Sequence, residues 1–382
     1  MANYDYEIVN GRKIRVRSKE TVSEIDKNGY FRRQPNHFTT PFGDGENDLK
    51  AEGNKRYRLV WAKLCHWSNR AAIVRELEGL EDQISVNMVE HAPHEKNLGW
   101  EYVYNENNID PVLGDQFLSE AYYRADDDYQ GRTTVPALID TTTGKVVNND
   151  YNWLTTYFEV NFRPWHKKGA PELYPVELRE EIDKMNLWLF DNINNAVYRS
   201  SFSRSNEGHF DGVNTFYAAM DRLEKRLETN RFLFGDYVTD SDIRLYVTLA
   251  RLDIRYTAQL GETKRPLYTY KNLWGYAKEL WEIPAFAHHT DFAAIIRQGR
   301  IEGEEDGFRA STHYDLALPK IDWDAQWKVS TERAYLSSDP THPIYLGNNR
   351  RFDIDPTWYD LGAESPKKEE KETPPSCGCC CG

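Results

Sequence analysis

Tyr57-Arg-Leu-Val-Trp61-Ala-Lys-Leu-Cys65-His-Trp-Ser-Asn-Arg70-Ala-Ala-Ile-Val74 is the stretch of the chain that decides the fold. Its first five residues are mostly apolar and predict a strand, and the run from Ser68 to Leu77 predicts a helix. Cys65 lies at the turn between them, where the unpaired N–H groups of a helix start carry partial positive charge. A thiol placed there ionises more easily and becomes a nucleophile, although a buried structural cysteine fits the same pattern.

The composition of the whole chain limits its function. The 382 residues suffice for two or three domains, and the net charge of −13 argues against nucleic-acid binding, which needs clustered Lys and Arg. No apolar run approaches the ~20 residues of a membrane span, and residues 1–7 contain no apolar signal segment. Because Cys65 is the only cysteine in the first 376 residues, we expect no disulfide framework and a cytoplasmic location.

The first 50 residues are polar, with Gly, Asn and Pro throughout, and carry Phe31, Phe38 and Phe42 at intervals. This composition predicts an extended arm (1–50) that packs over the domain through its aromatic rings. A disordered leader is the alternative.

A strand–helix–strand unit followed by a hairpin is predicted beyond the arm. Residues 84–89 alternate with period two and predict a strand parallel to the first. A polar insertion at 91–130 contains a short helix near 117–123. Residues 132–147 then predict two strands around a glycine turn, and 149–158 a helix opened by a capping residue.

This order resembles the thioredoxin-like layout, with Cys65 at the first strand-to-helix turn. In that fold a cis-proline precedes the third strand, and Val135-Pro136 stands at that position here. The backbone of Val135 would then be free to pair with a peptide ligand, as an added strand would.

Helical periods replace the strand pattern after a linker that contains three prolines. Apolar residues recur at helical spacing in 178–197, 213–227, 243–254 and 272–281. The third of these segments has apolar residues on several faces and is expected to be buried. Before it, Thr239 and Asp242 resemble a capping box, with Val238 and Ile243 as a hydrophobic staple.

The pattern divides the chain into an arm and four further segments. We expect an α/β domain at 51–165, an all-helical domain at 175–300, an extension that wraps over the surface at 301–364 and a disordered tail at 365–382.

The tail ends in four closely spaced cysteines, Cys377, Cys379, Cys380 and Cys381. An exposed tail without chemistry, a soft-metal site, a lipidation site and a redox arm that reaches Cys65 all remain open. We expect the tail to be dispensable for catalysis.

An α/β half followed by a helical half resembles a glutathione transferase, and the motifs resemble the Xi class, the glutathionyl-hydroquinone reductases. The similar segments are Cys65-His-Trp-Ser-Asn-Arg70, Gly79–Val86, Gly99-Trp100, Tyr129–Pro136, Leu173-Tyr-Pro175, Asp191–Arg199 and Phe234–Leu245. They cover about residues 30–300. The resemblance implies a thioredoxin-like domain followed by the helical C-terminal domain of these transferases.

The resemblance also implies roles for single residues. Cys65 is the nucleophile, and Trp100, Arg132, Val135 and Asp150 hold glutathione.

Four positions depart from the family pattern. Asp150 replaces a glutamate, although it can still face the amino group of glutathione. Tyr151 replaces a serine that would contact glutathione. His66 replaces the proline after the cysteine and is expected to be a solvated turn residue. Tyr198 and Tyr256 match two tyrosines of the hydroquinone pocket, and one of them is expected to protonate the leaving hydroquinone. A third tyrosine, expected near Gln298 and Gly299, is absent. The alternatives to these site roles are that Trp100 and Tyr256 are core aromatic residues and that Arg132 is a surface charge.

The implied activity is glutathione-dependent reduction of glutathionyl-hydroquinones through a Cys65–glutathione mixed disulfide. Glutathione is the co-substrate, no metal is expected in the core, and the family suggests a homodimer. An omega-like transferase or dehydroascorbate reductase, which would act on other electrophiles, is the second hypothesis. A non-catalytic binding scaffold is the third, and the joint presence of Cys65, Arg132, Val135-Pro136 and Asp150 argues against it.

Overall fold

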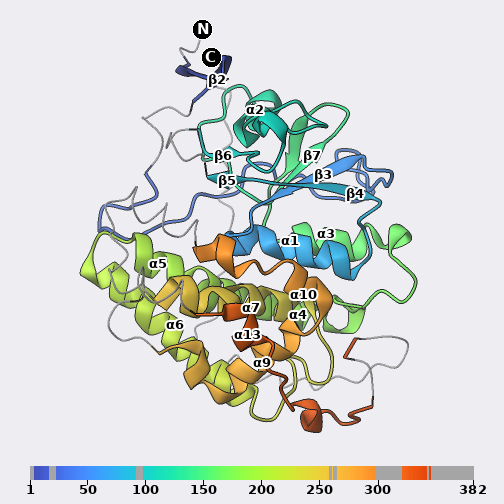
Figure 1. Ribbon diagram of the computed structural model, residues 1–382, viewed down its shortest axis with the longest axis vertical. Helices are drawn as coiled ribbons and strands as arrows, with labels where there is room; N and C mark the ends of the chain where they lie inside the picture. Colours follow the sequence, from blue (N-terminus) through green and yellow to red (C-terminus); the bar gives the residue numbers. More distant parts are fainter. Residues whose placement is uncertain are drawn as a thin grey trace, which may run out of the picture.

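The computed structural model describes residues 4–16, 23–91, 98–257, 260, 265–296, 321–341 and 344–345. In it a sheet domain lies above a helical domain, and the two are in contact through α1 (His66–Leu77) and α7 (Asp240–Arg251) (Figure 1). This is the predicted fold class: an α/β domain followed by an all-helical domain.

A four-stranded mixed sheet forms the centre of the first domain. Its strands are β3 (Tyr57–Trp61), β4 (Ile84–Met88), β7 (Ala137–Asp140) and β8 (Lys145–Asn148), in the spatial order β4-β3-β7-β8. Strand β3 runs parallel to β4 and antiparallel to β7, so that Leu59 lies beside both Val86 and Leu138. Every residue of β3 is buried, as expected of a central strand that helices cover on both faces.

Helices cover both faces of this sheet (Figure 1). Helix α1 and α3 (Leu154–Val160) lie on the side of the helical domain, and α2 (Leu118–Ala125) lies on the opposite side. The insertion before α2 contributes β5 (Glu90–His91), β6 (Trp100–Glu101) and the 3₁₀ turn η1 (Glu106–Asn108).

The predicted start of the third helix, at residue 149, is wrong. Asn148 Oδ1 accepts a hydrogen bond from the N–H of Asp150, and Asp150 Oδ1 accepts one from the N–H of Asn152. Such side-chain-to-backbone turns compete with helix. The helix therefore begins at Leu154.

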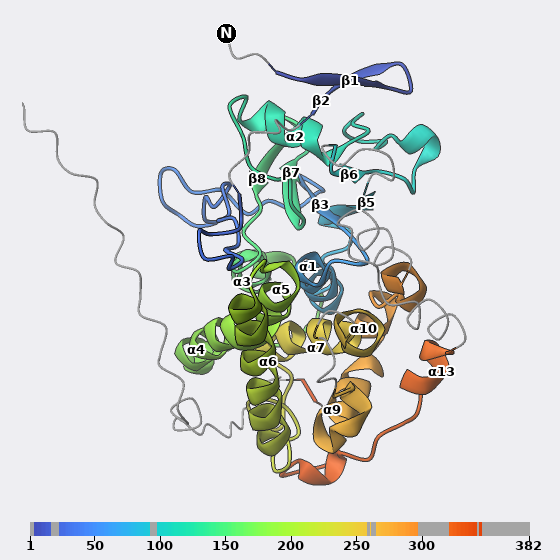
Figure 2. The ribbon, with the colours of Figure 1, turned by 90° about the vertical axis from the view of Figure 1, so that its left-hand side faces the viewer.

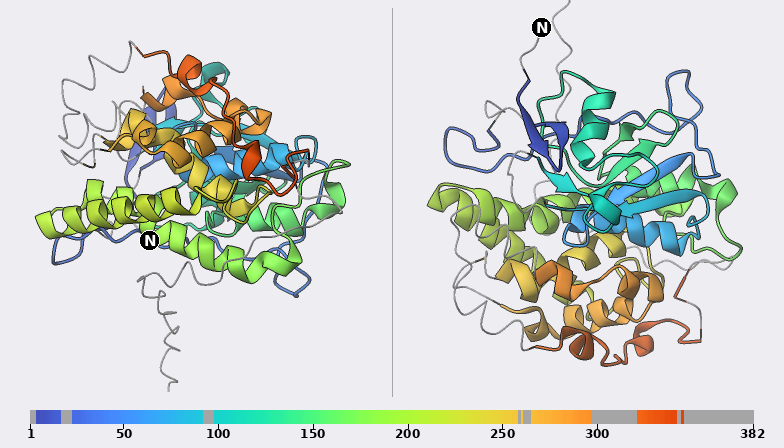
Figure 3. Two further views of the ribbon diagram at one scale, coloured as in Figure 1. Left: turned by 90° about the horizontal axis from the view of Figure 1, so that it is seen from below. Right: turned by 45° about the horizontal axis from the view of Figure 1, so that its top comes forward.

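Helix α7 is the core of the second domain, and all of its residues are buried, as predicted. Its capping box is confirmed, because Asp242 Oδ2 accepts the N–H of Thr239 at 2.8 Å. Around it are α4 (Arg179–Leu189), α5 (Ala196–Phe202), α6 (Asn206–Arg226), α9 (Lys271–Trp281) and α10 (Pro284–His288). Figure 3 shows α6 as a long rod along one edge of this domain. Shorter turns are η2 (Arg163–Trp165), η3 (Val176–Leu178), the π-helical η4 (Phe190–Asn194) and η5 (Leu252–Tyr256), and η7 (Leu267–Thr269).

The N-terminal arm packs on the domain as predicted. Phe31 and Phe42 are buried, and the ring of Phe38 meets that of Tyr122 at 5.4 Å. The sequence reasoning missed a hairpin at the start of the arm, β1 (Tyr6–Val9) with β2 (Arg12–Arg15), which lies beyond α2 in Figure 2. Its signal is the Asn10-Gly11 pair, whose positive φ values of 49° and 80° fit a two-residue hairpin turn.

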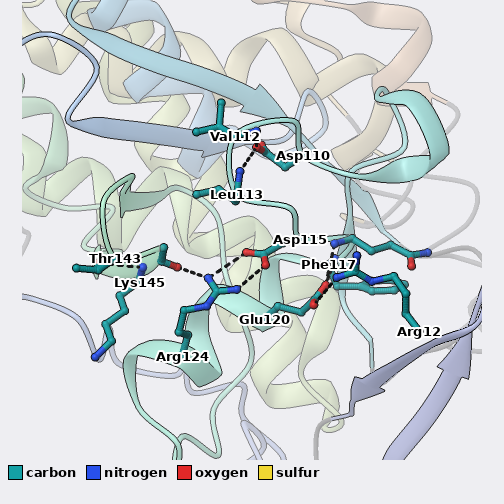
Figure 4. Close-up of polar contacts among 12 residues, drawn as sticks. Arg12, Asp110, Val112, Leu113, Asp115, Phe117, Glu120, Arg124, Thr143 and Lys145 are labelled. Atoms are coloured by element: carbon teal, nitrogen blue, oxygen red, sulfur yellow. Dashed lines mark hydrogen bonds and ion pairs between the residues drawn. The ribbon is translucent and has the colours of Figure 1, made fainter.

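Polar contacts attach this hairpin to α2 (Figure 4). Arg12 pairs with Glu120 of α2 at 2.9 Å, and Arg124, one turn later, pairs with Asp115 at 2.5 Å. Burial raises the pKa of Asp115 to about 6 in spite of the arginine. The Arg12–Glu120 pair connects residues 108 positions apart in sequence, whereas the Arg124–Asp115 pair is local and holds α2 to the segment before it.

The described part of the C-terminal extension lies against the helical domain. It contains α13 (Trp323–Trp327) and η9 (Ala334–Leu336), and Trp327 packs its ring against Trp274 and Phe292. Arg333 is buried and donates hydrogen bonds to the carbonyls of Leu227 and Asn230 at 3.0 and 2.9 Å.

Two sequence expectations fall on other parts of the chain. The missing third tyrosine near Gln298 and Gly299 and the cysteine tail (Cys377, Cys379, Cys380, Cys381) lie outside the described residues. None of the helices within the described ranges is long and apolar enough to cross a membrane.

Candidate active site

Cys65 is the residue that caps the N-terminus of α1. Its N–H donates to the carbonyl of Ala62 at 3.0 Å, and its Sγ lies 3.7 Å from the carbonyl oxygen of Val135. The Val135–Pro136 peptide bond is cis, as predicted. The thiol therefore lies next to both the cis-proline segment that precedes β7 and the N-terminus of α1, which is the positive end of that helix.

Arg251, from the helical domain, holds the segment that precedes the cysteine. It is fully buried, and its guanidinium donates to the carbonyls of Lys63 and Leu64, both at 2.7 Å. The sequence reasoning missed this residue. The available signal was the presence of two arginines, Arg244 and Arg251, inside a helix predicted to be buried, because a buried guanidinium needs partners to satisfy its donors.

A second buried guanidinium, that of Arg70, lies in the helix that follows the cysteine. Burial, followed by the charge of Arg244, lowers the pKa of Arg70 to about 9, and negative charge on Cys65 acts in the opposite direction. Burial also lowers the pKa of Arg251, and negative charge on Tyr256 and Cys65 acts in the opposite direction. Both guanidiniums thus place positive charge close to the sulfur.

The thiol opens into a pocket of about 430 Å³ between the two domains. Of the residues expected from the sequence, six line it: Cys65, Trp100, Arg132, Val135, Tyr151 and Tyr198. Asp150 and Tyr256 lie behind the wall. Asp150 Oδ1 accepts a hydrogen bond from Asn36 Nδ2 at 2.9 Å, and it is Asn36 that faces the pocket.

Trp100 and Arg132 form part of the wall on the side of the sheet domain. The ring of Trp100 stacks on His91 at 3.9 Å between centroids. Arg132 is not a free surface charge, because its Nε lies 2.7 Å from Glu24 of the arm. Burial, the largest influence, raises the pKa of Glu24, but the charge and hydrogen bond of Arg132, with the N–H of Gln34 and the charge of Arg33, together lower the pKa below its usual value.

The arm supplies a whole side of the pocket that the sequence did not predict. Its lining residues are Glu24, Ile25, Phe31, Arg33, Gln34 and Asn36. The aromatic residues of the arm predicted that it packs over the domain. The polar residues between them show no periodic pattern, so the sequence did not indicate which of them face the pocket.

The expectation for His66 is wrong. The side chain is fully buried, not solvated, because the helical domain covers it. His66 Nδ1 lies 3.1 Å from Thr248 Oγ1 and 3.2 Å from the hydroxyl of Tyr256. Burial, with the charges of Arg70 and others, lowers the pKa of His66 well below its usual range, so the imidazole is neutral at pH 7.

The two tyrosines expected at the acceptor occupy different depths. Tyr198 lines the pocket, and its ring centroid lies 5.7 Å from that of Trp67. Tyr256 is 2% exposed, lies 6.3 Å from Tyr198 between ring centroids, and burial raises its pKa well above 10. Tyr151, where the family has serine, packs its ring on Trp67 at 4.7 Å.

Among the described residues, no group of three or more His, Cys, Asp or Glu side chains could hold a metal ion.

Comparison with known proteins agrees with this geometry. The family model for the glutathione S-transferase C-terminal domain matches residues 197–279. A glutathione S-transferase omega-like 2 from Schizosaccharomyces pombe is 35% identical, over 70% of this chain and 88% of that protein. The glutathionyl-hydroquinone reductase YqjG of Escherichia coli is 33% identical, over 63% of this chain and 73% of its own length.

Solved structures give the same result. The Xi glutathione S-transferase of Phanerochaete chrysosporium superposes with a TM-score of 0.65 at 33% identity, covering 71% of this chain and 88% of that one. The glutathione-bound structure of YqjG has a TM-score of 0.64 at 30% identity, covering 75% and 94%. With relatives of this identity and coverage in both comparisons, the chain belongs to the Xi class of glutathione transferases, the family of the glutathionyl-hydroquinone reductases.

Proposed function

We propose that this enzyme reduces glutathionyl-hydroquinones to hydroquinones, with glutathione as co-substrate. The observation that carries the proposal is the position of Cys65, at the N-terminus of α1 and 3.7 Å from the Val135 carbonyl, on the wall of a pocket between the domains. The E. coli relative bears the name of this activity, and its structure was solved with glutathione bound.

In the first step, the Cys65 thiolate attacks the sulfur of the glutathionyl conjugate. A Cys65–glutathione disulfide forms and the bond from sulfur to the aromatic carbon breaks. The electron pair of that bond stays on the carbon, which takes up a proton and leaves as the hydroquinone. Tyr198 is the proposed proton donor, because it lines the pocket. Tyr256, whose hydroxyl lies 3.2 Å from His66 Nδ1, is the alternative proton donor.

In the second step, a glutathione thiolate attacks the mixed disulfide. Oxidised glutathione leaves and the Cys65 thiolate is restored. Cys65 is the one cysteine within the described residues, so the cycle we propose uses a single protein thiol. One glutathione and one conjugate are consumed for each hydroquinone and each oxidised glutathione formed.

Glutathione is proposed to bind on the side of the sheet domain. Val135 would pair with its backbone and Trp100 would cover it, while Arg132 would meet a carboxylate. Asp150 would act on the ammonium group through Asn36, its hydrogen-bond partner on the pocket wall.

An omega-like transferase that acts on other electrophiles is the second candidate. It is favoured by the omega-like name of the S. pombe relative and by Tyr151, which lines the pocket at a position where the resemblance implies a serine. The two candidates differ in product, because conjugation consumes free electrophile and releases no oxidised glutathione.

Intact-mass spectrometry tests the proposal. A glutathionyl-hydroquinone added to the reduced enzyme without free glutathione is expected to leave one glutathione on the protein and to release hydroquinone. Peptide mapping assigns the adduct to Cys65 or to the tail. The proposal is wrong if hydroquinone appears without an adduct on Cys65, or if neither forms.

We also propose a homodimer in a reducing, cytoplasmic compartment, as the family resemblance and the single body cysteine suggest. Leu187 and Phe210 of the helical domain are more than half exposed and offer apolar area for an interface. Light scattering at micromolar concentration checks the assembly, and a monomer mass contradicts it.

A further inference from the structure

The pocket has a charge opposite to that of the chain. The protein has a net charge of −13, yet the charged side chains of the pocket wall are four arginines and one glutamate: Arg33, Arg132, Arg204, Arg255 and Glu24. Glu24 is held by Arg132, and its charge interaction with Arg33 is a weaker one. The wall thus has more positive charge than glutathione's own site needs.

The surplus cations lie away from the sheet domain. Arg33 belongs to the arm, Arg204 follows α5 directly, and Arg255 lies in η5, whereas Arg132 precedes the cis-proline. Arg33 contacts the ring of Tyr198, and Arg204 and Arg255 reach the pocket wall from segments of the helical domain. The acceptor ring must lie on this side of the pocket if glutathione occupies the side of the sheet domain.

Arg33 is fixed by aromatic rings and an amide, with no acidic partner in hydrogen-bond contact among the described residues. Its guanidinium carbon lies 4.4 Å from the ring centroids of both Trp67 and Tyr198, and its Nε donates to Asn195 Oδ1 at 2.9 Å. Its Nη2 is buried and has no hydrogen-bond partner in that part of the chain. A buried donor without a partner is costly, and a ligand oxygen would satisfy it.

The floor of this half is aromatic. Phe202 lies one turn after Tyr198 on α5, with 5.6 Å between the ring centroids, and Phe31 of the arm lies 5.4 Å from Phe202. These rings are tilted by 40° and 49° against one another and give an apolar aromatic surface. Such a surface with guanidiniums on the same wall fits an aromatic ring that carries a negative group, because guanidiniums bind carboxylates in charge-assisted pairs.

We propose, on the basis of the function proposed above, that the preferred substrates are glutathionyl-hydroquinones with an anionic substituent such as a carboxylate on the ring. Arg33 and Arg204 bind the anionic group, with Arg255 at the inner end of the same half. Arg204 is exposed and stands at the entrance, whereas Arg255 is 7% exposed.

Two conjugates of similar shape test this subsite. One is the glutathionyl conjugate of methylhydroquinone, and the other is that of 2,5-dihydroxybenzoate, which carries a carboxylate where the first carries a methyl group. The full-length wild-type enzyme is expected to show a kcat/KM roughly tenfold higher for the carboxylate conjugate, the size of one charge-assisted hydrogen bond. Arg33→Gln and Arg204→Gln are each expected to lower that ratio several-fold.

Arg265→Gln is the matched control. Arg265 is a half-exposed arginine that pairs with Asp221 and is not part of the pocket wall, so its loss is expected to leave the ratio unchanged. An equal kcat/KM for both conjugates in the wild type overturns the subsite. The subsite is also overturned if the two pocket variants show a higher KM for glutathione while the ratio of the two kcat/KM values stays unchanged. That result would mean that these arginines bind glutathione.

A binding measurement separates this proposal from the proposed function. Calorimetry with 2,5-dihydroxybenzoate and with methylhydroquinone needs no turnover. Tighter binding of 2,5-dihydroxybenzoate than of methylhydroquinone, with the difference lost in Arg204→Gln, supports the subsite. If the enzyme then reduces neither conjugate, only the proposed reaction is contradicted. Equal or undetectable binding of both compounds to an enzyme that reduces both conjugates equally contradicts only the subsite.

Discussion

Glu24 in the N-terminal arm forms an ion pair of 2.7 Å with Arg132, which lies 108 residues later and just before the cis-proline. The arm thus places a carboxylate on the arginine that we propose for a carboxylate of glutathione. Ligand and arm compete for one guanidinium.

Glu24→Gln is therefore expected to lower the KM for glutathione. The pair is partly exposed, so the gain is modest, about threefold, in line with exposed ion pairs. Steady-state kinetics with varied glutathione measures it. Glu172→Gln, which breaks the pair with Arg163 outside the pocket, is the control. A higher KM in Glu24→Gln would show instead that Glu24 binds glutathione.

Cys65→Ser is expected to abolish reduction and to leave the fold intact. Serine does not ionise at neutral pH and forms no disulfide, but it has nearly the same shape. The half-buried site predicts a change in unfolding free energy within about 1 kcal/mol. Activity and circular dichroism measured on one preparation check both parts, and more than trace activity contradicts the mechanism.

The buried His66 is expected to make stability depend on pH. Its pKa is well below 6.5 in the folded state, whereas the unfolded chain binds a proton near 6.5. This contribution to stability is therefore complete above 6.5 and falls as pH decreases toward the folded pKa, with a loss of at most about 1.4 kcal/mol at pH 5.5.

His66→Gln should remove this loss. Urea unfolding at pH 7.5 and 5.5 compares it with the wild type and with His37→Gln, a half-exposed histidine beside Asp126. An equal pH dependence in His66→Gln and the wild type would show that His66 does not carry it.

Arg333→Ala is expected to destabilise the helical domain. From within the C-terminal extension, its guanidinium donates to four backbone carbonyls, those of Leu227, Asn230, Arg231 and Asn272. Its loss leaves these buried groups unpaired, at a cost of about 3 kcal/mol. Arg265→Ala, on the surface, should cost less than about 0.5 kcal/mol. Similar urea midpoints for the two variants would mean that the extension contributes little to the fold.

Deletion of residues 366–382 is expected to leave catalysis unchanged. The check is single-turnover loss of the Cys65 adduct with and without added glutathione. Faster glutathione-independent loss in the full-length protein would make the cysteine tail a resolving arm.

Local patterns in the sequence determined most of the secondary structure. The strand Tyr57–Trp61, the helix after Cys65 and the capping box of Thr239 and Asp242 depend on residues within a few positions of each other, and all three are confirmed. The helix expected from residue 149 was wrong because Asn148 and Asp150 form side-chain turns in place of the first helical turn. Composition does not show whether such residues will cap a helix or delay its start.

Only the tertiary structure decided how the site is enclosed. His66 looked like a turn residue, but Tyr256, 190 residues later, lies against it, and the helical domain buries it. Arg33 and Glu24 follow no period, yet the path of the arm brings them to the pocket wall. A periodic pattern shows which face of an element is apolar, but not which distant segment covers that face. The nucleophile could therefore be found from the sequence, whereas the charges that surround it could not.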